Sequence, residues 1–546
     1  MCGIFAYIGT LINHPELLEA YLKTRNRGPD DNQLKGITRN LTFGFHRLSI
    51  MDTSYKGNQP LFHPSKPYSV ICNGEIYNYK ELINEYNLSP FSNSDCEVIL
   101  YLYERFGIEG VLSRIDSESF SFCLYDGEQN KLLVARDRFG VRPLFVAHTI
   151  NNEYIFSSET KSLIGLLDPT TDSITQFPPG CWREYDLTHK TSDDIESQQP
   201  QYNRYYNYEY PEIVDTTQNH RIQIKQKLTE AVNKRLMSDR PIGCLLSGGL
   251  DSSLISALVC KEFKRQGRGI LNTFSIGITG STDLMYAQKV ADHIGSKHHT
   301  IEMSEEYFLN AIPEVIYHIE SYDTTTVRAS VGNYLIGKYI KENTDITVVF
   351  NGDGSDEQSG YLYLGNAPSE QDFKQECIRL LSEIHYFDVL RSDRSLSSNW
   401  SLETRTPFLD TDFVNYYMSI ESKEKMYTNR IEKYLLRSAF DGDDLLPHDV
   451  LWRRKEAFSD GCSSKERSWH KVIQEHIEKH VSDEEYKANT YTHNPPQLKE
   501  SYLYRKIFDS FYKGFANIIP HYWMPSWTDC IDPSARELDV YTDYMV

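Results

Sequence analysis

Residues 247–253 read Ser-Gly-Gly-Leu-Asp-Ser-Ser and lie between an apolar run, Pro241–Leu246, and a helical pattern, Ser252–Arg265. This order predicts a buried strand, a glycine loop and a helix whose first backbone N–H groups can receive an anion. The paired glycines let a phosphate approach the backbone, and Asp251 can ligate Mg²⁺ through oxygen. Because the pattern G-x-x-x-x-G-K-[ST] is absent, the loop is not a P-loop.

The alternation of strands and helices continues on both sides of this loop. Helices are expected at Ile222–Met237 and Leu284–Ile294, and strands at Leu271–Ile278, His299–Met303 and Ile346–Phe350. This alternation predicts an α/β domain with a parallel sheet and right-handed crossovers. The last strand runs into a second glycine loop, residues 351–357, which carries Asp353 and Asp356. Ligands bind outside the carboxyl ends of parallel strands, so we expect both loops to face a ligand.

Residues 1–190 show a different pattern, in which short β-like runs are separated by turn residues. The runs are Leu41–Phe45, Tyr68–Cys72, Ser119–Tyr125, Lys131–Ala135 and Tyr154–Phe156, and helices are expected at Pro15–Lys23 and Cys96–Phe106. They predict an α+β domain with antiparallel sheets. Apolar residues then become scarce, and we expect residues 191–219 to link this domain to a second one at 220–546. Beyond about residue 370 the second domain is expected to be helical.

The composition is that of a soluble globular protein. The chain has 546 residues, 40% of them hydrophobic and 25% charged, with a mean hydropathy of −0.52. With 57 Lys and Arg against 77 Asp and Glu, the net charge of −20 disfavours binding to nucleic acid or to an anionic membrane. Ten cysteines without a C-x-x-C pair fit neither a disulfide framework nor a zinc site of usual spacing. No signal-peptide pattern is present, and we expect a cytoplasmic location.

Cys2 follows the initiator methionine, and loss of Met1 would place a thiol and a free α-amine on one residue. An α-amine with a pKa of about 7.7 to 8.0 can act as general base for the thiol near neutral pH. Asn73-Gly74 predicts a two-residue hairpin turn, although the Asn amide and the Gly N–H are also suitable donors for an oxyanion. Arg47 and Asp95 suit the carboxylate and ammonium of an amino acid, although each residue type is also common in surface ion pairs.

Four segments together resemble the class II glutamine amidotransferases: Met1–Ile4, Arg27–Asp30, Asn73–Asn78 and Arg136–Leu144. The resemblance implies an N-terminal-nucleophile hydrolase fold, with two stacked antiparallel sheets between helices. It implies Cys2 as the nucleophile with its own amine as base, and Asn73 and Gly74 as the oxyanion hole. It also implies a glutamine site that consists of Arg47, Leu48, Ile50, Asn73, Glu75 and Asp95.

The loop at 247–253 resembles the pyrophosphate loop of ATP pyrophosphatases, which cleave ATP between the α and β phosphates. Nearly the whole chain resembles the glutamine-hydrolysing asparagine synthetase family. The resemblance is carried by the two glycine loops, by Ser401–Asp410 and Trp452–Gly461, and by an animal-type tail, His521–Trp527. This resemblance implies glutamine, aspartate and ATP as substrates, Mg²⁺ as cofactor, β-aspartyl-AMP as intermediate, and a possible homodimer.

The same resemblance implies roles for single residues of the second domain. Asp251 and Asp356 would ligate Mg²⁺, Arg328 and Lys455 would stabilise charge on the pyrophosphate, and Asp353 would handle the incoming ammonia. The implied ATP-binding residues are Leu246, Ser247, Gly248, Gly249, Asp251, Ser252, Ser253, Ile276, Gly277 and Gly352.

The sequence departs from the family pattern at a few positions. Asn26 replaces His before Arg-Gly-Pro-Asp, and in the second loop Asn351 replaces Ser and Asp353 replaces Glu. The segment before Gly360 is one residue shorter. Two alternatives follow: a related synthetase that acts on another acid, such as a β-lactam synthetase, or a catalytically weak binding or storage protein on this fold. An intact Cys2 argues against the first, and the complete loop at 247–253 argues against the second.

Overall fold

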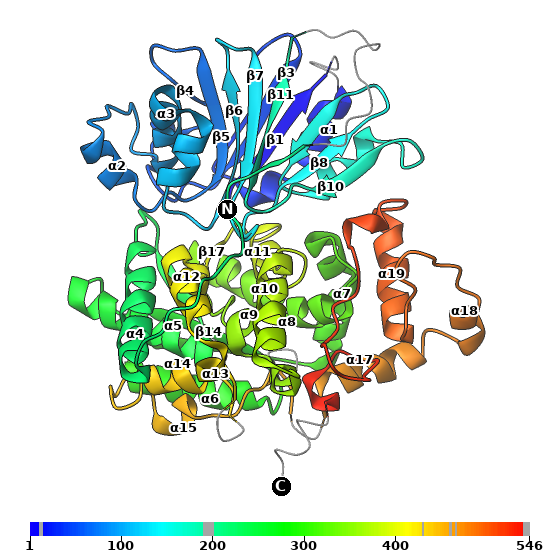
Figure 1. Ribbon diagram of the computed structural model, residues 1–546. Helices are drawn as coiled ribbons and strands as arrows, with labels where there is room; N and C mark the ends of the chain where they lie inside the picture. The colour runs from blue at the N-terminus through cyan, green and yellow to red at the C-terminus, as the bar shows by residue number, and fades with distance from the viewer. Residues whose placement is uncertain (10–14, 189–200, 428–430, 458–460, 465–466, 539–546) are drawn as a thin grey trace.

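The computed structural model describes residues 1–9, 15–188, 201–427, 431–457, 461–464 and 467–538. The strands of the N-terminal domain, drawn in blue to cyan, lie above the helices and strands of the C-terminal domain (Figure 1). Residues 191–200 of the predicted linker lie outside the described residues. No helix of the described residues is long and apolar enough to cross a membrane.

The N-terminal domain contains two six-stranded sheets in which all neighbouring strands are antiparallel. In order across the first sheet, the strands are β10 (Ser173–Gln176), β8 (Phe145–His148), β9 (Tyr154–Ser157), β1 (Gly3–Ile8), β3 (Leu41–Arg47) and β2 (Asp31–Gly36). In the second sheet they are β12 (Asn203–Arg204), β11 (Cys181–Asp186), β7 (Lys131–Arg136), β6 (Phe120–Asp126), β5 (Tyr68–Gly74) and β4 (Leu61–Phe62).

Alternating side chains stack these two sheets face to face. Ile4 of β1 packs in one apolar cluster with Ile71 of β5, between the sheets. Phe5 points the other way and packs with residues of α1 (Pro15–Leu22). The outer face of the second sheet is covered by α2 (Tyr79–Glu85) and α3 (Val98–Arg114). The predicted arrangement, two stacked antiparallel sheets between helices, is therefore confirmed.

The C-terminal domain is built on a five-stranded parallel sheet, which confirms the predicted α/β architecture. Its strands in spatial order are β15 (Lys297–Met303), β14 (Asn272–Ile278), β13 (Ile242–Leu245), β16 (Val348–Phe350) and β17 (Glu403–Arg405). The strand β17 at the edge was not predicted, because its three residues, Glu-Thr-Arg, carry no apolar alternation. It nevertheless lies fully buried against the N-terminal domain.

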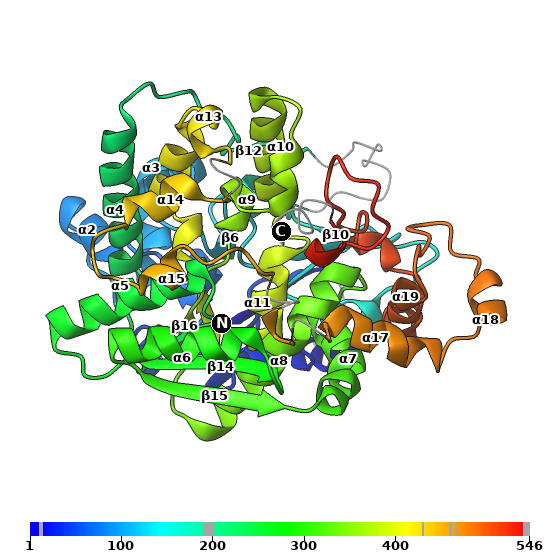
Figure 2. The ribbon, with the colours of Figure 1, turned by 90° about the horizontal axis from the view of Figure 1, so that it is seen from below.

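Helices cover both faces of this parallel sheet. One face packs against α7 (Glu305–Ile319) and α8 (Thr324–Asn343), and the other against α4 (Thr217–Lys234), α5 (Leu250–Gln266) and α6 (Thr282–Ile294). Seen from below, α6 lies along β14 and β15 (Figure 2). The remainder is mostly helical, as predicted: α9 (Asp356–Ser359), α10 (Glu370–Glu383), α11 (Asp388–Ser397), α12 (Thr411–Ser419), α13 (Ser422–Lys425), α14 (Tyr434–Ala439), α15 (His448–Leu451), α17 (Trp469–Glu478), α18 (Asp483–Lys487) and α19 (Lys499–Phe511).

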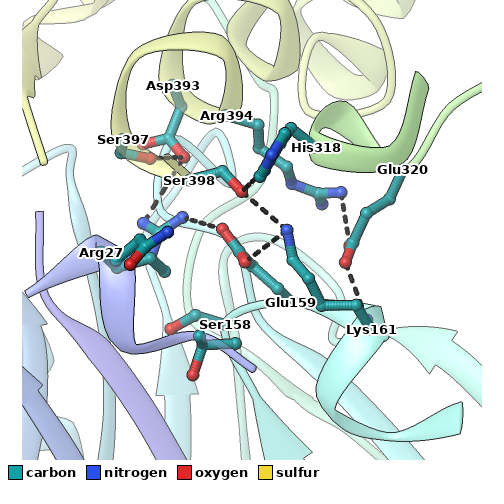
Figure 3. Close-up of polar contacts among 12 residues, drawn as sticks. Arg27, Ser158, Glu159, Lys161, His318, Glu320, Asp393, Arg394, Ser397 and Ser398 are labelled. Atoms are coloured by element: carbon teal, nitrogen blue, oxygen red, sulfur yellow. Dashed lines mark hydrogen bonds and ion pairs between the residues drawn. The ribbon is translucent and has the colours of Figure 1, made fainter. Parts of the chain in front are cut away.

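The two domains meet across a buried network of ion pairs (Figure 3). Arg27 lies 2.8 Å from Glu159 of its own domain and 3.6 Å from Asp393 of α11. Lys161 also pairs with Glu159, at 2.9 Å. Glu320, which follows α7, accepts a hydrogen bond from the backbone N–H of Lys161 at 2.8 Å. Buried charges of both signs therefore fix the orientation of one domain on the other.

Candidate functional site

A cavity beside Cys2 brings together all the residues predicted for the glutamine site. This Cys2 cavity is lined by Cys2, Arg47, Leu48, Ile50, Asn73, Gly74, Glu75 and Asp95, among others. They come from the start of β1, the end of β3 and the loop after it, the end of β5, and the turn before α3. The stacking of the two sheets therefore places these strand ends around one thiol.

The Cys2 thiol is held in an environment that favours its neutral form. Its Sγ donates a hydrogen bond to the carbonyl oxygen of Leu48 at 3.6 Å. Burial raises the pKa of this thiol to about 11. Since the thiolate is the nucleophilic form, a nearby base is required for attack at neutral pH.

The hairpin turn predicted at Asn73-Gly74 is wrong, because both residues belong to β5. They pair with Ser121 and Phe120 of β6. The Asn73 side chain is 1% exposed, and neither atom of its amide makes a hydrogen bond to the described residues. A buried polar group without a partner is costly, so its position in the lining of a cavity indicates a ligand for the amide. A Cβ at Gly74 would lie 2.5 Å from the Ser119 carbonyl oxygen, so only glycine fits there.

Three buried carboxyl groups line the same cavity: Glu75, Asp95 and Glu403. Burial raises the pKa of Asp95 to about 6, and burial together with Glu403 and Asp95 raises the pKa of Glu75. Glu403 belongs to β17 of the other domain, and nothing in the sequence predicted its presence here. Arg47 donates hydrogen bonds to the carbonyl oxygens of Ser54 and Met51, at 2.6 and 3.3 Å, and so shapes the loop beside the cavity.

A second cavity, of about 190 Å³, lies between the two glycine loops of the C-terminal domain. Ten of the predicted residues line this two-loop cavity: Leu246, Ser247, Gly249, Asp251, Ser252, Ile276, Gly352, Asp353, Asp356 and Lys455. The structure does not bring Gly248, Ser253, Gly277 or Arg328 to its lining. Arg328 lies on α8, where its guanidinium pairs with Glu500 at 2.6 Å and with Asp532 at 2.8 Å.

The loop after β13 is held in a shape that opens the first turn of α5 to the cavity. Gly248 adopts φ 75°, and a Cβ there would lie 2.5 Å from the backbone nitrogen of Ala287. The hydroxyl oxygens of Ser247 and Ser252 lie 2.9 Å apart and close the loop. The first N–H groups of a helix have no partner within the helix, so binding of an anion at the start of α5 stays a prediction.

Two lysines bridge the two carboxylates predicted to bind a metal. Lys433 Nζ lies 2.6 Å from Asp251 and 2.6 Å from Asp356, and Lys455 also pairs with both. Burial alone would raise the pKa of Asp356, but the two lysines outweigh it and hold the pKa below its usual value. The sequence did not predict that Lys433 belongs to this site, because Lys433 lies in neither glycine loop.

The donor set at these carboxylates fits Mg²⁺ bound together with a phosphate. Among the described residues no group of three or more His, Cys, Asp or Glu side chains could hold a metal by itself. The carboxylates of Asp251 and Asp356 nevertheless both contact the same group, the ammonium of Lys433. Mg²⁺ commonly takes one or two carboxylates, substrate phosphates and water, and two convergent carboxylates are compatible with that mode.

Asp353 lies in a cluster of buried polar groups at the edge of the two-loop cavity. The Asn351 side chain donates a hydrogen bond to Asp353 at 2.9 Å. Burial raises the pKa of Asp353, and Arg391 opposes that rise. Tyr361 donates to Glu357 at 3.0 Å and to Asp388 at 2.9 Å. The sequence predicted Asp353 here but not Arg391 or Asp388, which come from α11.

Comparisons with known proteins cover nearly the whole chain. Residues 1–179 match the family model described as "Glutamine amidotransferase domain", and residues 223–369 and 358–528 match "Asparagine synthase". The protein named "Asparagine synthetase [glutamine-hydrolyzing]" from Gallus gallus is 43% identical over 560 residues, 99% of each chain. The protein of the same name from Homo sapiens is 42% identical over 564 residues, again 99% of each chain. The predicted resemblance is confirmed, and the chain belongs to the glutamine-hydrolysing asparagine synthetase family.

Proposed function

We propose that this protein converts aspartate to asparagine, with glutamine as nitrogen donor and ATP as energy source. ATP is cleaved to AMP and pyrophosphate by way of β-aspartyl-AMP, and glutamine is hydrolysed to glutamate. The observation that supports the proposal is the presence of two cavities on one chain, each lined by residues predicted for one of the two half-reactions.

In the N-terminal domain, the Cys2 sulfur attacks the carboxamide carbon of glutamine. The oxyanion that forms accepts hydrogen bonds from the Asn73 amide and the Gly74 N–H. Removal of Met1 frees the Cys2 α-amine, which takes the thiol proton and passes it to the leaving ammonia. Water then hydrolyses the thioester. Glutamine is held through its charged ends by Arg47, Glu75 and Asp95, beside Leu48 and Ile50.

In the C-terminal domain, the two-loop cavity binds ATP and aspartate. Leu246 and Ile276 contact the adenosine, and the loop at 247–253 binds the pyrophosphate. Asp251 and Asp356 would hold Mg²⁺, which would neutralise charge on the phosphates. Lys455 stabilises the charge that moves onto the departing pyrophosphate. A phosphate contact from Arg328 stays a prediction, since it requires exchange of Glu500 and Asp532 for the nucleotide.

The reaction products test the proposed function directly. Incubation with glutamine, aspartate and MgATP should yield asparagine, glutamate, AMP and pyrophosphate in equal amounts. ADP and orthophosphate as primary products would contradict it. As a control, Cys2→Ala should abolish glutamine-dependent synthesis and retain synthesis from ammonia, because the two cavities act separately. Intact mass should show that Met1 is absent.

A homodimer and a cytoplasmic location stay predictions for this chain. Light scattering on the purified protein tests the first, and imaging of the tagged protein in its own cell tests the second.

A further inference from the structure

The C-terminal part of the described chain forms one wall of the two-loop cavity. Trp523, Pro533 and Ala535 line that cavity together with both glycine loops. They belong to residues 523–536, called the tail segment below, whose described structure is irregular apart from a three-residue turn of helix at its end. Chain ends of this kind stay in place only when other elements hold them. The contacts of the tail segment therefore decide the shape of the cavity.

Arg328 of α8 holds the tail segment through Asp532. Its guanidinium donates two hydrogen bonds to Asp532, at 2.8 and 2.9 Å, and two to Glu500 of α19, at 2.8 and 2.6 Å. Paired hydrogen bonds between an arginine and a carboxylate are among the strongest polar contacts in proteins. Arg328 is 3% exposed and lies outside the lining of the cavity, so it reaches the cavity only through the residues that it holds.

Two further contacts tie the ends of the tail segment to the cavity. At one end, the Trp523 N–H donates to Asp323 at 2.7 Å, and the Trp523 ring lies 5.3 Å from that of Tyr361. At the other end, Arg536 pairs with Glu456 at 3.1 Å. Tyr361 and Glu456 both line the cavity. The ion pair described above lies between these two ends and fixes the middle of the wall.

A direct contact between Arg328 and a phosphate would require these ion pairs to open. Two carboxylates would then lose their cation, although Glu500 is only 1% and Asp532 only 8% exposed. A buried charge that loses its partner is strongly destabilising. Asp532 also directly precedes Pro533 of the cavity wall, so its unpaired charge would repel an entering polyphosphate. The geometry thus favours a guanidinium that stays on the tail segment.

We infer that Arg328 is a positioning residue, which acts on the two-loop cavity by holding the tail segment as its wall. This role rests on the proposed function of the cavity as the site of ATP and aspartate. Asp532 is then as necessary as Arg328 itself. A phosphate contact from Arg328 would give Asp532 the opposite role, that of a competitor for the guanidinium.

Asp532→Asn separates the two roles, because it weakens the ion pair and nearly preserves the shape of the side chain. We expect KM for MgATP in synthesis from ammonia to rise roughly 10-fold with a smaller change in kcat, since fewer molecules have the wall in place. Arg328→Gln should show the same defect, and the double variant should be no worse than either single one, because the two residues act as a unit. An unchanged or lower KM in Asp532→Asn would overturn the inference.

A matched control is Asp529→Asn, in the same tail segment. Asp529 is exposed and lies outside the lining of the cavity, so this variant should leave KM for MgATP unchanged. Glutamine hydrolysis should be unchanged in every variant, because the tail segment lies outside the described lining of the Cys2 cavity. The glutaminase rate therefore shows that each variant is folded.

Limited proteolysis of the unmodified protein is a second test, which does not depend on the folding of a variant. The Arg536 side chain is only 10% exposed, so cleavage by trypsin after Arg536 requires the tail segment to leave the wall. This cleavage, followed by mass spectrometry, should become slower when MgATP binds behind an intact wall.

In a protein that makes asparagine, two results of this proteolysis would overturn the inference. Faster cleavage with MgATP would mean that the nucleotide draws Arg328 away from Asp532, and an unchanged rate would mean that the tail segment is not a wall of the site. Failure of the proposed function is distinguishable, because the unmodified protein would then make no asparagine.

Discussion

The Asn73 amide stands buried in the Cys2 cavity without a hydrogen bond to the described residues. Asn73→Ala removes a donor for the oxyanion, and kcat for glutamine hydrolysis should fall roughly 100- to 1,000-fold with little change in KM. The melting temperature should not fall, because no hydrogen bond of the fold is broken. Glutaminase kinetics and calorimetry check this pair of results. A normal kcat would exclude Asn73 from the oxyanion hole.

Asp353 and Asn351 are two departures from the family pattern, and they are hydrogen-bonded to each other. Because Asn351 fixes the position of the shorter carboxylate, Asp353→Glu alone should lower the yield of asparagine per glutamine hydrolysed, by roughly 10- to 100-fold. The double variant Asn351→Ser, Asp353→Glu should recover part of the loss, since neighbouring residues are not additive. An improved yield in the single variant would show that the two positions are independent.

Asp353→Asn is the complementary variant for the same carboxylate. It should reduce asparagine formation while exchange of pyrophosphate into ATP survives, because adenylation precedes the attack of ammonia. The two rates are measured on the same preparation. Equal activity of the unmodified, Asn and Glu forms would mean that Asp353 is only a solvated turn residue.

Motif residues were predictable because their chemistry is local to a strand end and the loop after it. Asp251 and Asp356 both follow predicted strands and both reach the two-loop cavity. Lys433 and Glu403 reach the cavities through long-range packing alone, so no local pattern marks them. Arg328 shows the converse: its motif was recognised, but ion pairs with Glu500 and Asp532 decide where its guanidinium lies.

The loop between β13 and α5 depends on glycine at one position. An alanine at position 248 would have to adopt a positive φ, and its Cβ would lie 2.5 Å from the backbone nitrogen of Ala287. Gly248→Ala should therefore strongly reduce synthesis from ammonia and raise KM for ATP. Glutamine hydrolysis should persist. Gly267→Ala is the matched control: it also has positive φ, 66°, but no atom lies within 4 Å of the added Cβ. It should cost about 1 kcal/mol of stability and no activity.

Secondary structure was predictable where apolar periodicity decided it. The parallel strands β13, β14 and β16 were each found, since their buried runs are nearly continuous. The Asn73-Gly74 prediction failed because β5 extends over both residues, and pairing with β6 overrides the local preference for a turn. The edge strand β17 is defined by its neighbours and not by its own polar sequence.

Two buried histidines should lower the stability of the molecule as the pH falls below about 6.5. Burial lowers the pKa of His318 to about 3 and that of His46 to about 4, from 6.5. The unfolded chain then binds more protons than the folded one, so each imidazole costs on the order of 2 kcal/mol between pH 7.5 and pH 5. Urea midpoints at both pH values measure the loss. Relative to the unmodified protein, His318→Asn should gain stability at pH 5 compared with pH 7.5. An equal shift of the midpoint in both proteins would contradict this role of His318.

The three residues of β17 have a consequence for exchanging modules between related enzymes. The Arg405 side chain contacts Glu75, while its carbonyl oxygen accepts the N–H of Asn351, the first residue of the second loop, at 3.1 Å. A chimera joined at the linker would replace the N-terminal domain, which contains Glu75, and would keep Arg405 and Asn351 of the C-terminal domain. Grafting an amidotransferase domain from a relative should therefore succeed only when residues 403–405 are replaced by their counterparts from the same relative.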